Sequence, residues 1–164
     1  MSIFRRLFAP PERKVLAIMD PFTRAALLLV PRDRYENDEV HKKRVLVFLF
    51  GALDALIQAE RITGDAMSET LSLYLMLAFP TMSESEVKNT VNFLADASAD
   101  PAWIPIMQRG GQTMVDWSRG DSTAPARLVK IVQHGLDDFL LAYVKRLDTR
   151  SQRSRSSVRK WNRL

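Results

Sequence analysis

The apolar stretch from Val45 to Leu53 constrains the fold of this chain more than any other part of its sequence. These nine residues carry no charged or strongly polar side chain, and the apolar pattern continues to Ile62 without a turn residue. The whole pattern is too long for one buried strand, whereas the uninterrupted run is much shorter than the ~20 residues that span a bilayer. The stretch therefore predicts a buried helix in a globular protein.

The few small or polar positions in this stretch recur at spacings of three and four, which places them in one narrow stripe along a helix. They are Gly51, Asp54, Gln58 and Arg61. The rest of the circumference is apolar, so other elements must surround the helix. We expect it to span about 38–63, to begin at an N-cap formed by Asn37 or Asp38, and to end in a left-handed cap at Gly64.

Gly51 lies inside this expected helix, where glycine is less favourable than alanine by about 1 kcal/mol. We expect the backbone of another element to cross closely at this position. Gly51→Leu should then destabilise the protein far more than Gly51→Ala, and equal effects would contradict a close crossing.

Prolines and capping residues divide the rest of the chain into further helices. Ser83 and Glu86 fit the S-x-x-E capping box, which is the clearest local signal of a helix start in the chain. The Asp20-Pro21 pair is expected to end one helix and to begin the next, because proline lacks an amide hydrogen. Residues 30–37 are expected to form a polar loop.

Residues 101–120 are open to two interpretations, because Gly110-Gly111 falls inside an otherwise helical pattern. They form either one helix or two. The last helix is expected to begin near Thr123 or Ala124 and to end near position 147. The sequence shows no internal repeat, strand pair or hairpin signal. It predicts an all-α fold, a compact bundle of six to seven helices around the central apolar helix at about 38–63, followed by a basic C-terminal tail.

The length of 164 residues and the absence of cysteine limit the protein further. The length predicts one helical domain over residues 1–148, large enough to bury its own core. Without cysteine, disulfides, thiolate metal sites and thiol catalysis are excluded. No secretory signal is visible, because a proline pair follows the N-terminal arginines where an apolar region would be required. We expect a cytoplasmic protein.

Residues 1–10 are predicted to form an N-terminal amphipathic arm. If the arm is helical, one face carries Ile3, Phe4, Leu7 and Phe8, and the two arginines lie on the opposite face. One interpretation is a weak membrane-surface anchor. The favoured interpretation is an arm packed on the bundle or on a second protomer, which makes Phe4, Leu7 and Phe8 candidate partner-binding residues.

The C-terminal tail, residues 149–164, carries the positive charge of the chain. It holds five arginines and one lysine without an acid, which is +6, so a net charge of +5 leaves −1 for residues 1–148. Its composition favours disorder. Cations around one tryptophan suit phosphate backbones, single-stranded bases or an anionic bilayer surface. The candidate contacts to nucleic acid or another anion are Arg150, Arg153, Arg155, Arg159, Lys160, Trp161 and Arg163.

Groups that could carry chemistry are few. His134 has the spacing of a two-ligand metal half-site with Asp137 and Asp138, but such spacings are common on solvated helical faces, and His41 is the only other imidazole. No nucleophile motif is present. Two interpretations are open for Asp54, inside the central helix: a half-buried carboxyl with a raised pKa, or a structural pair with an arginine, which is the more frequent case. The sequence predicts no catalytic residue, no cofactor and no metal.

The sequence therefore predicts a non-enzymatic protein-interaction module, such as an adaptor, inhibitor or regulatory subunit, that acts through apolar helical surfaces. Helices near 37–63 and 66–79 are apolar on several faces, so a protein partner or a homodimer is expected. The alternative is a nucleic-acid-binding protein that uses the arginine-rich tail. An enzyme with an unfamiliar site would need a deep polar pocket around His134 or Asp54.

Overall fold

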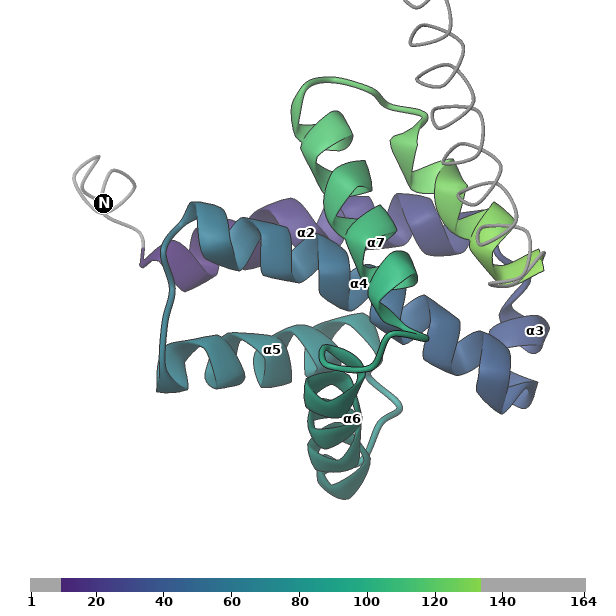
Figure 1. Cartoon of the computed structure of the whole chain (residues 1–164), viewed down its shortest axis with the longest axis horizontal. Coiled ribbons are helices and arrows are strands. Elements are labelled where there is room, and N and C mark those ends of the chain that lie inside the picture. Colours follow the sequence, from purple (N-terminus) through teal and green to yellow (C-terminus); the bar gives the residue numbers. More distant parts are fainter. Residues whose placement is uncertain (1–9, 134–164) are drawn as a thin grey trace, which may run out of the picture. The chain divides into compact units, whose positions relative to one another are not determined.

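The computed structural model describes residues 10–133, and its regular structure is helical throughout this range (Figure 1). The helices are Pro11–Leu28 (α2), Arg32–Asn37 (α3), Glu39–Ala59 (α4), Asp65–Ala78 (α5), Glu84–Ala97 (α6) and Ile104–Ser118 (α7). A short 3₁₀ turn, Ala124–Ala126 (η1), leads into a further helix that begins at Arg127. The all-α prediction is confirmed. None of the helices within 10–133 is both long and apolar enough to cross a membrane.

Helix α4 is the central element of the described part. Figure 1 shows α7 crossing it on one side and α2 passing on the other, while α5 runs alongside. Phe48, Leu49 and Leu53 of α4 are completely or almost completely buried, as the continuous apolar run requires. Asp38 caps the start of this helix, because its Oδ1 accepts the backbone N–H groups of Val40 (2.9 Å) and of the following residue. The predicted central helix is confirmed.

Helices α4 and α7 cross so closely that glycine is required on both. An ideal Cβ on Gly51 would lie 1.9 Å from the carbonyl oxygen of Met107, and one on Gly110 would lie 1.9 Å from that of Phe48. The predicted close crossing at Gly51 is therefore present. An added methyl group would already meet a backbone carbonyl there, so Gly51→Ala is itself expected to destabilise the protein. Helix α7 runs through Gly110 without a break, which settles residues 104–118 as one helix.

Helix α2 also runs without a break, through Pro21, so the break expected there is wrong. Its buried side chains recur at helical spacing on both sides of the proline: Val15, Met19, Phe22 and Ala26. Pro21 itself and Ala17, whose carbonyl loses its hydrogen bond, are exposed, so water can satisfy that carbonyl. The free energy gained by burying side chains on both sides of Pro21 outweighs the loss of this one hydrogen bond.

The remaining helix ends show which local sequence signals predicted a helix boundary correctly. The capping box is confirmed, since Glu86 Oε2 accepts the backbone N–H of Ser83 (2.7 Å) and Ser83 Oγ accepts that of Glu86 (3.3 Å). The left-handed cap of α4 falls on Arg61 (φ 55°) and not on Gly64, which precedes α5. The N–H of Ile62 bonds to a carbonyl five residues earlier, as in a Schellman motif.

Part of the expected polar loop at 30–37 forms the short helix α3. Arg32 Nε donates to Glu36 Oε1 at 2.6 Å, an i,i+4 pair that supports one helical turn. The last helix begins within a few residues of the expected position, whereas its expected end near 147 lies outside the described residues.

Candidate interaction surface between helices α2 and α5

Neighbouring faces of α2 and α5 line a groove that encloses a cavity of about 420 Å³. The lining positions recur at spacings of three and four on each helix, so each helix contributes one face. The α2–α5 groove is formed by Leu16, Asp20, Thr23, Arg24, Leu27, Tyr74, Leu77 and Ala78.

Two polar pairs line the groove. Thr23 Oγ1 and Tyr74 Oη are hydrogen-bonded at 2.9 Å, and both residues are buried. Burial raises the pKa of the Tyr74 hydroxyl, which therefore stays neutral. Arg24 Nε donates to Asp20 Oδ1 (3.0 Å), and both of these side chains are exposed. The groove therefore offers a ligand apolar walls with one exposed ion pair, Arg24–Asp20, beside them.

Large apolar side chains extend from the groove into solvent. Leu77, one wall of the groove, is 68% exposed, and Leu73 and Met76 continue the same exposed stripe of α5. On α2, Leu28 is 86% exposed. Single exposed apolar residues are ordinary, but a stripe that adjoins an apolar groove is typical of a binding surface. The α2–α5 groove is therefore the candidate functional site of the described part.

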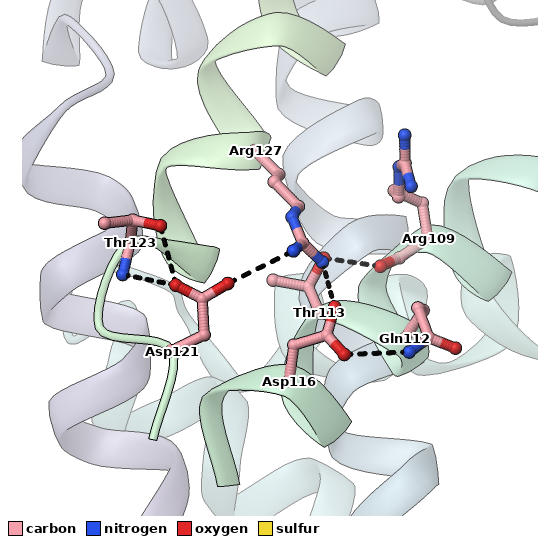
Figure 2. Close-up of polar contacts among 7 residues, drawn as sticks. All are labelled: Arg109, Gln112, Thr113, Asp116, Asp121, Thr123 and Arg127. Atoms are coloured by element: carbon pink, nitrogen blue, oxygen red, sulfur yellow. Dashed lines mark hydrogen bonds and ion pairs between the residues drawn. The ribbon is translucent and has the colours of Figure 1, made fainter. Parts of the chain in front are cut away.

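A polar cluster at the end of α7 is the second candidate site (Figure 2). Asp116 accepts hydrogen bonds from Arg127 and from Gln112 Nε2 (3.0 Å), which lower the pKa of its carboxyl. Asp121 accepts the hydroxyl (2.6 Å) and backbone N–H (3.0 Å) of Thr123, which lower its pKa, and it is also paired with Arg127. These groups satisfy one another and connect α7 to η1 and the next helix. The cluster is structural.

A smaller cavity, of about 240 Å³, lies among α3, α4 and the α5–α6 connection. Charged side chains of both signs line it, together with apolar ones. The charged residues are Arg32, Glu36, Lys42 and Glu86. Arg32 and Glu36 are paired with each other, and Glu86 belongs to the capping box. No set of like groups converges there, so this cavity gives no basis for a specific ligand.

Three threonines are the buried polar side chains of residues 10–133. Thr23 is bonded to Tyr74, whereas Thr70 and Thr113 each donate to the main-chain carbonyl four residues earlier, at 2.6 Å. The bond from Thr113 is drawn in Figure 2. None of these hydroxyls is left to act on a ligand.

The two titratable residues that the sequence singled out within the described part have structural surroundings. His41 lies in the first turn of α4, with Nδ1 3.3 Å from Oδ2 of Asp38. Asp54 is about half-buried, and burial raises the pKa of its carboxyl, which is the less favoured of the two interpretations. Its partner is the amide of Gln58, which donates to it at 2.6 Å, and not the arginine considered as the alternative. Neither residue lines a cavity described above.

The other predicted site residues lie outside the described residues. This holds for the apolar arm (Phe4, Leu7, Phe8), for all seven contacts of the tail, and for the metal half-site at His134. Within 10–133, no three His, Cys, Asp or Glu side chains are grouped as a metal site would require. The sequence did not single out the α2–α5 groove. The recurrence of Leu16, Asp20, Thr23 and Leu27 on one face was the signal available, but it does not show which helix lies opposite.

Comparison of the chain with protein-family models, with curated proteins and with solved structures found no match in any of the three. The class that the fold defines is an all-α protein, and its described part carries an open groove between α2 and α5.

Proposed function

We propose that this chain is a non-enzymatic, cytoplasmic protein-interaction module, an adaptor, inhibitor or regulatory subunit, that binds a protein partner through the α2–α5 groove. The observation that carries this proposal is the position of Leu77, which forms a groove wall and is still 68% exposed. A volume of about 420 Å³ lies within the range of ~300–1,000 Å³ typical of binding pockets.

The chemistry of the groove favours one mode of recognition. Leucines on both helices form its walls, beside the buried Thr23–Tyr74 hydrogen bond and the exposed Arg24–Asp20 pair. An amphipathic helix that lays apolar side chains into a groove uses such a surface, and each leucine-sized side chain that is fully buried contributes about 1.5–3 kcal/mol. A partner helix with apolar residues at spacings of three and four is therefore the expected ligand.

Leu77→Glu is expected to abolish partner binding without unfolding the protein. The substituted side chain is mostly in solvent in the free chain, whereas in a complex it would place a carboxylate in an apolar contact. Val40→Glu is the matched control, because Val40 is 53% exposed and lies on α4 outside the groove. The measurement is capture from cell extract by the wild-type chain and both variants, quantified by mass spectrometry.

Proteins retained by the wild-type chain and by Val40→Glu but lost with Leu77→Glu would be partners of the groove. If no captured protein distinguishes the two variants, the α2–α5 groove is not the binding surface. Light scattering on the same samples tests the predicted homodimer, since a dimer formed through this face would become a monomer in Leu77→Glu only.

Nucleic-acid binding through the tail is the second candidate function, with an anionic membrane surface as its variant. It is supported by the concentration of charge, +6 in residues 149–164 against −1 in the rest of the chain. Replacing the six basic residues of the tail with glutamine in the full chain should abolish oligonucleotide binding in fluorescence anisotropy. The wild-type affinity should fall with a log–log salt slope of about −4 to −5. Equal, salt-insensitive signals from both chains would rule this function out.

A further inference from the structure

On the basis of the proposed function, we infer that the partner helix of the α2–α5 groove is basic, with lysine or arginine residues beside its apolar ones. The sign of the charge follows from one exposed face of α5 that adjoins the groove. The residues of this face recur at spacings of three and four, apart from the last, which is also a wall of the groove. This α5 stripe consists of Asp65, Glu69, Leu73, Met76 and Leu77, all of them exposed.

The α5 stripe is acidic at its beginning and apolar at its end. Asp65 lies in the first turn of α5 and Glu69 one turn later, whereas the three apolar residues lie in the last two turns. Helix α5 contains no basic residue, and neither carboxylate forms a hydrogen bond or an ion pair within residues 10–133. A cation brought by a ligand would therefore meet two carboxylates without a competing partner in the described part.

The sequence around α5 adds to this negative charge. Residues 62–108, which include α5 and α6, hold six acidic residues and one lysine, which is −5. Because residues 1–148 carry −1 in total, the rest of that range carries +4. Helices α5 and α6 are in contact, so the acidic residues belong to one region of the protein. Such a region attracts cationic ligands and repels anionic ones.

One bound helix can use both ends of the α5 stripe. Asp65 and Leu77 are twelve residues apart, which corresponds to about 18 Å along α5, the length of a partner helix of about 12 residues. Apolar side chains at one end of that helix would contact Leu77 and the groove. A lysine or arginine one to two turns away would lie opposite Glu69. The partner that fits is therefore an amphipathic helix with its apolar and basic residues at successive turns.

The same arrangement of charge disfavours a second copy of this chain on the α5 stripe. Two antiparallel α5 helices would place the carboxylates of each copy against the leucines of the other, which costs desolvation energy. Two parallel α5 helices would bring the carboxylates of both copies together, and like charges across an interface repel. A basic partner avoids both costs.

The test is fluorescence anisotropy of the full chain with two synthetic peptides that differ only in charge. One is an amphipathic helix of leucine and lysine, and the other has glutamate in place of every lysine. We expect the leucine–lysine peptide to bind about tenfold more tightly or better. Glu69→Lys should weaken its binding about fivefold and strengthen that of the leucine–glutamate peptide. Circular dichroism verifies that all variants are folded.

Asp33→Lys is the matched control, because it changes the net charge equally and Asp33 is exposed. Asp33 belongs to α3, which Figure 1 shows at the opposite end of the described part from the start of α5. Both affinities should stay within about twofold of the wild-type values, since charges further apart than about 10 Å are largely screened. Equal effects of Asp33→Lys and Glu69→Lys would overturn the inference, because only the net charge would then matter.

Leu77→Ser separates docking on the stripe from a general attraction between charges, because it removes an apolar contact without changing the charge. It should weaken binding of the leucine–lysine peptide about tenfold. An unchanged affinity would overturn the inference, because the peptide would then bind elsewhere. Equal affinities of the two peptides, both lost in Leu77→Ser, would also overturn it but would leave the proposed function intact, because the groove would bind helices of either charge.

Two other occupants of the surface would be recognised in the same samples. A dimer in light scattering that is lost in Leu77→Ser would overturn the inference, because a second copy would then cover the stripe. Tighter peptide binding by the chain whose six basic tail residues are glutamine would overturn it as well, because the tail would then be the basic ligand. Unchanged peptide affinity in that chain and a monomer in light scattering are the results expected.

Discussion

Replacing Gly110 with alanine is expected to destabilise the protein by about 3 kcal/mol or more, at the upper end of overpacking effects. The added methyl group would lie 1.9 Å from the carbonyl oxygen of Phe48, which belongs to the backbone of α4 and cannot rotate away. Helices α4 and α7 would have to separate, which would loosen the largest contact between helices in the described part. The gain in helix propensity from glycine to alanine, about 1 kcal/mol, does not offset this cost.

Gly111 provides the matched control, one residue further along α7. A Cβ at Gly111 would lie 3.2 Å from the carbonyl oxygen of Gly51, a tight contact that a shift of a few tenths of an ångström relieves. Gly111→Ala has the same gain in propensity and is expected to change stability by less than about 1 kcal/mol. Urea unfolding monitored by circular dichroism compares the two variants. Equal midpoints would show that α4 and α7 do not cross with their backbones in contact.

The features that the sequence predicted correctly are those that local physics determines. The Ser83–Glu86 capping box needs only four residues, and the burial of Phe48 and Leu53 follows from an apolar run that no exposed helix could carry. The close crossing at Gly51 was also predictable, because an unfavourable glycine inside a buried helix needs a compensating contact. What the glycine contacts could not be predicted, since Met107 is distant in the sequence.

The errors arose where packing overrides a local rule. Proline usually ends a helix, yet α2 continues through Pro21, because the buried residues on both sides fit one helical face. Gly64 was expected to adopt the left-handed cap of α4, but Arg61 adopts it where buried Ile62 continues the core. The α2–α5 groove belongs to the same category. It depends on the contact between Thr23 and Tyr74, 51 residues apart, which no local pattern encodes.

Replacing Phe22 with alanine is expected to destabilise the protein by about 3–5 kcal/mol, the usual cost of deleting a fully buried phenylalanine side chain. Phe22 of α2 is completely buried. Its ring centroid lies 6.4 Å from that of Phe48 on α4, nearly parallel to it, and 6.0 Å from that of Trp117 on α7, edge to face. One side chain therefore connects three helices, and its loss leaves a cavity bordered by all three.

Leu28→Ala is the control, because Leu28 lies on the same helix and is 86% exposed. It is expected to change stability by less than about 0.5 kcal/mol, as surface substitutions usually do. Urea unfolding followed by circular dichroism is the suitable measurement, since Trp117 fluorescence would respond to the local change itself. Similar midpoints for the two variants would mean that α2 does not dock on α4 and α7 through Phe22. The wall that α2 provides for the groove depends on this docking, so the same result would also remove the basis of the proposed binding surface.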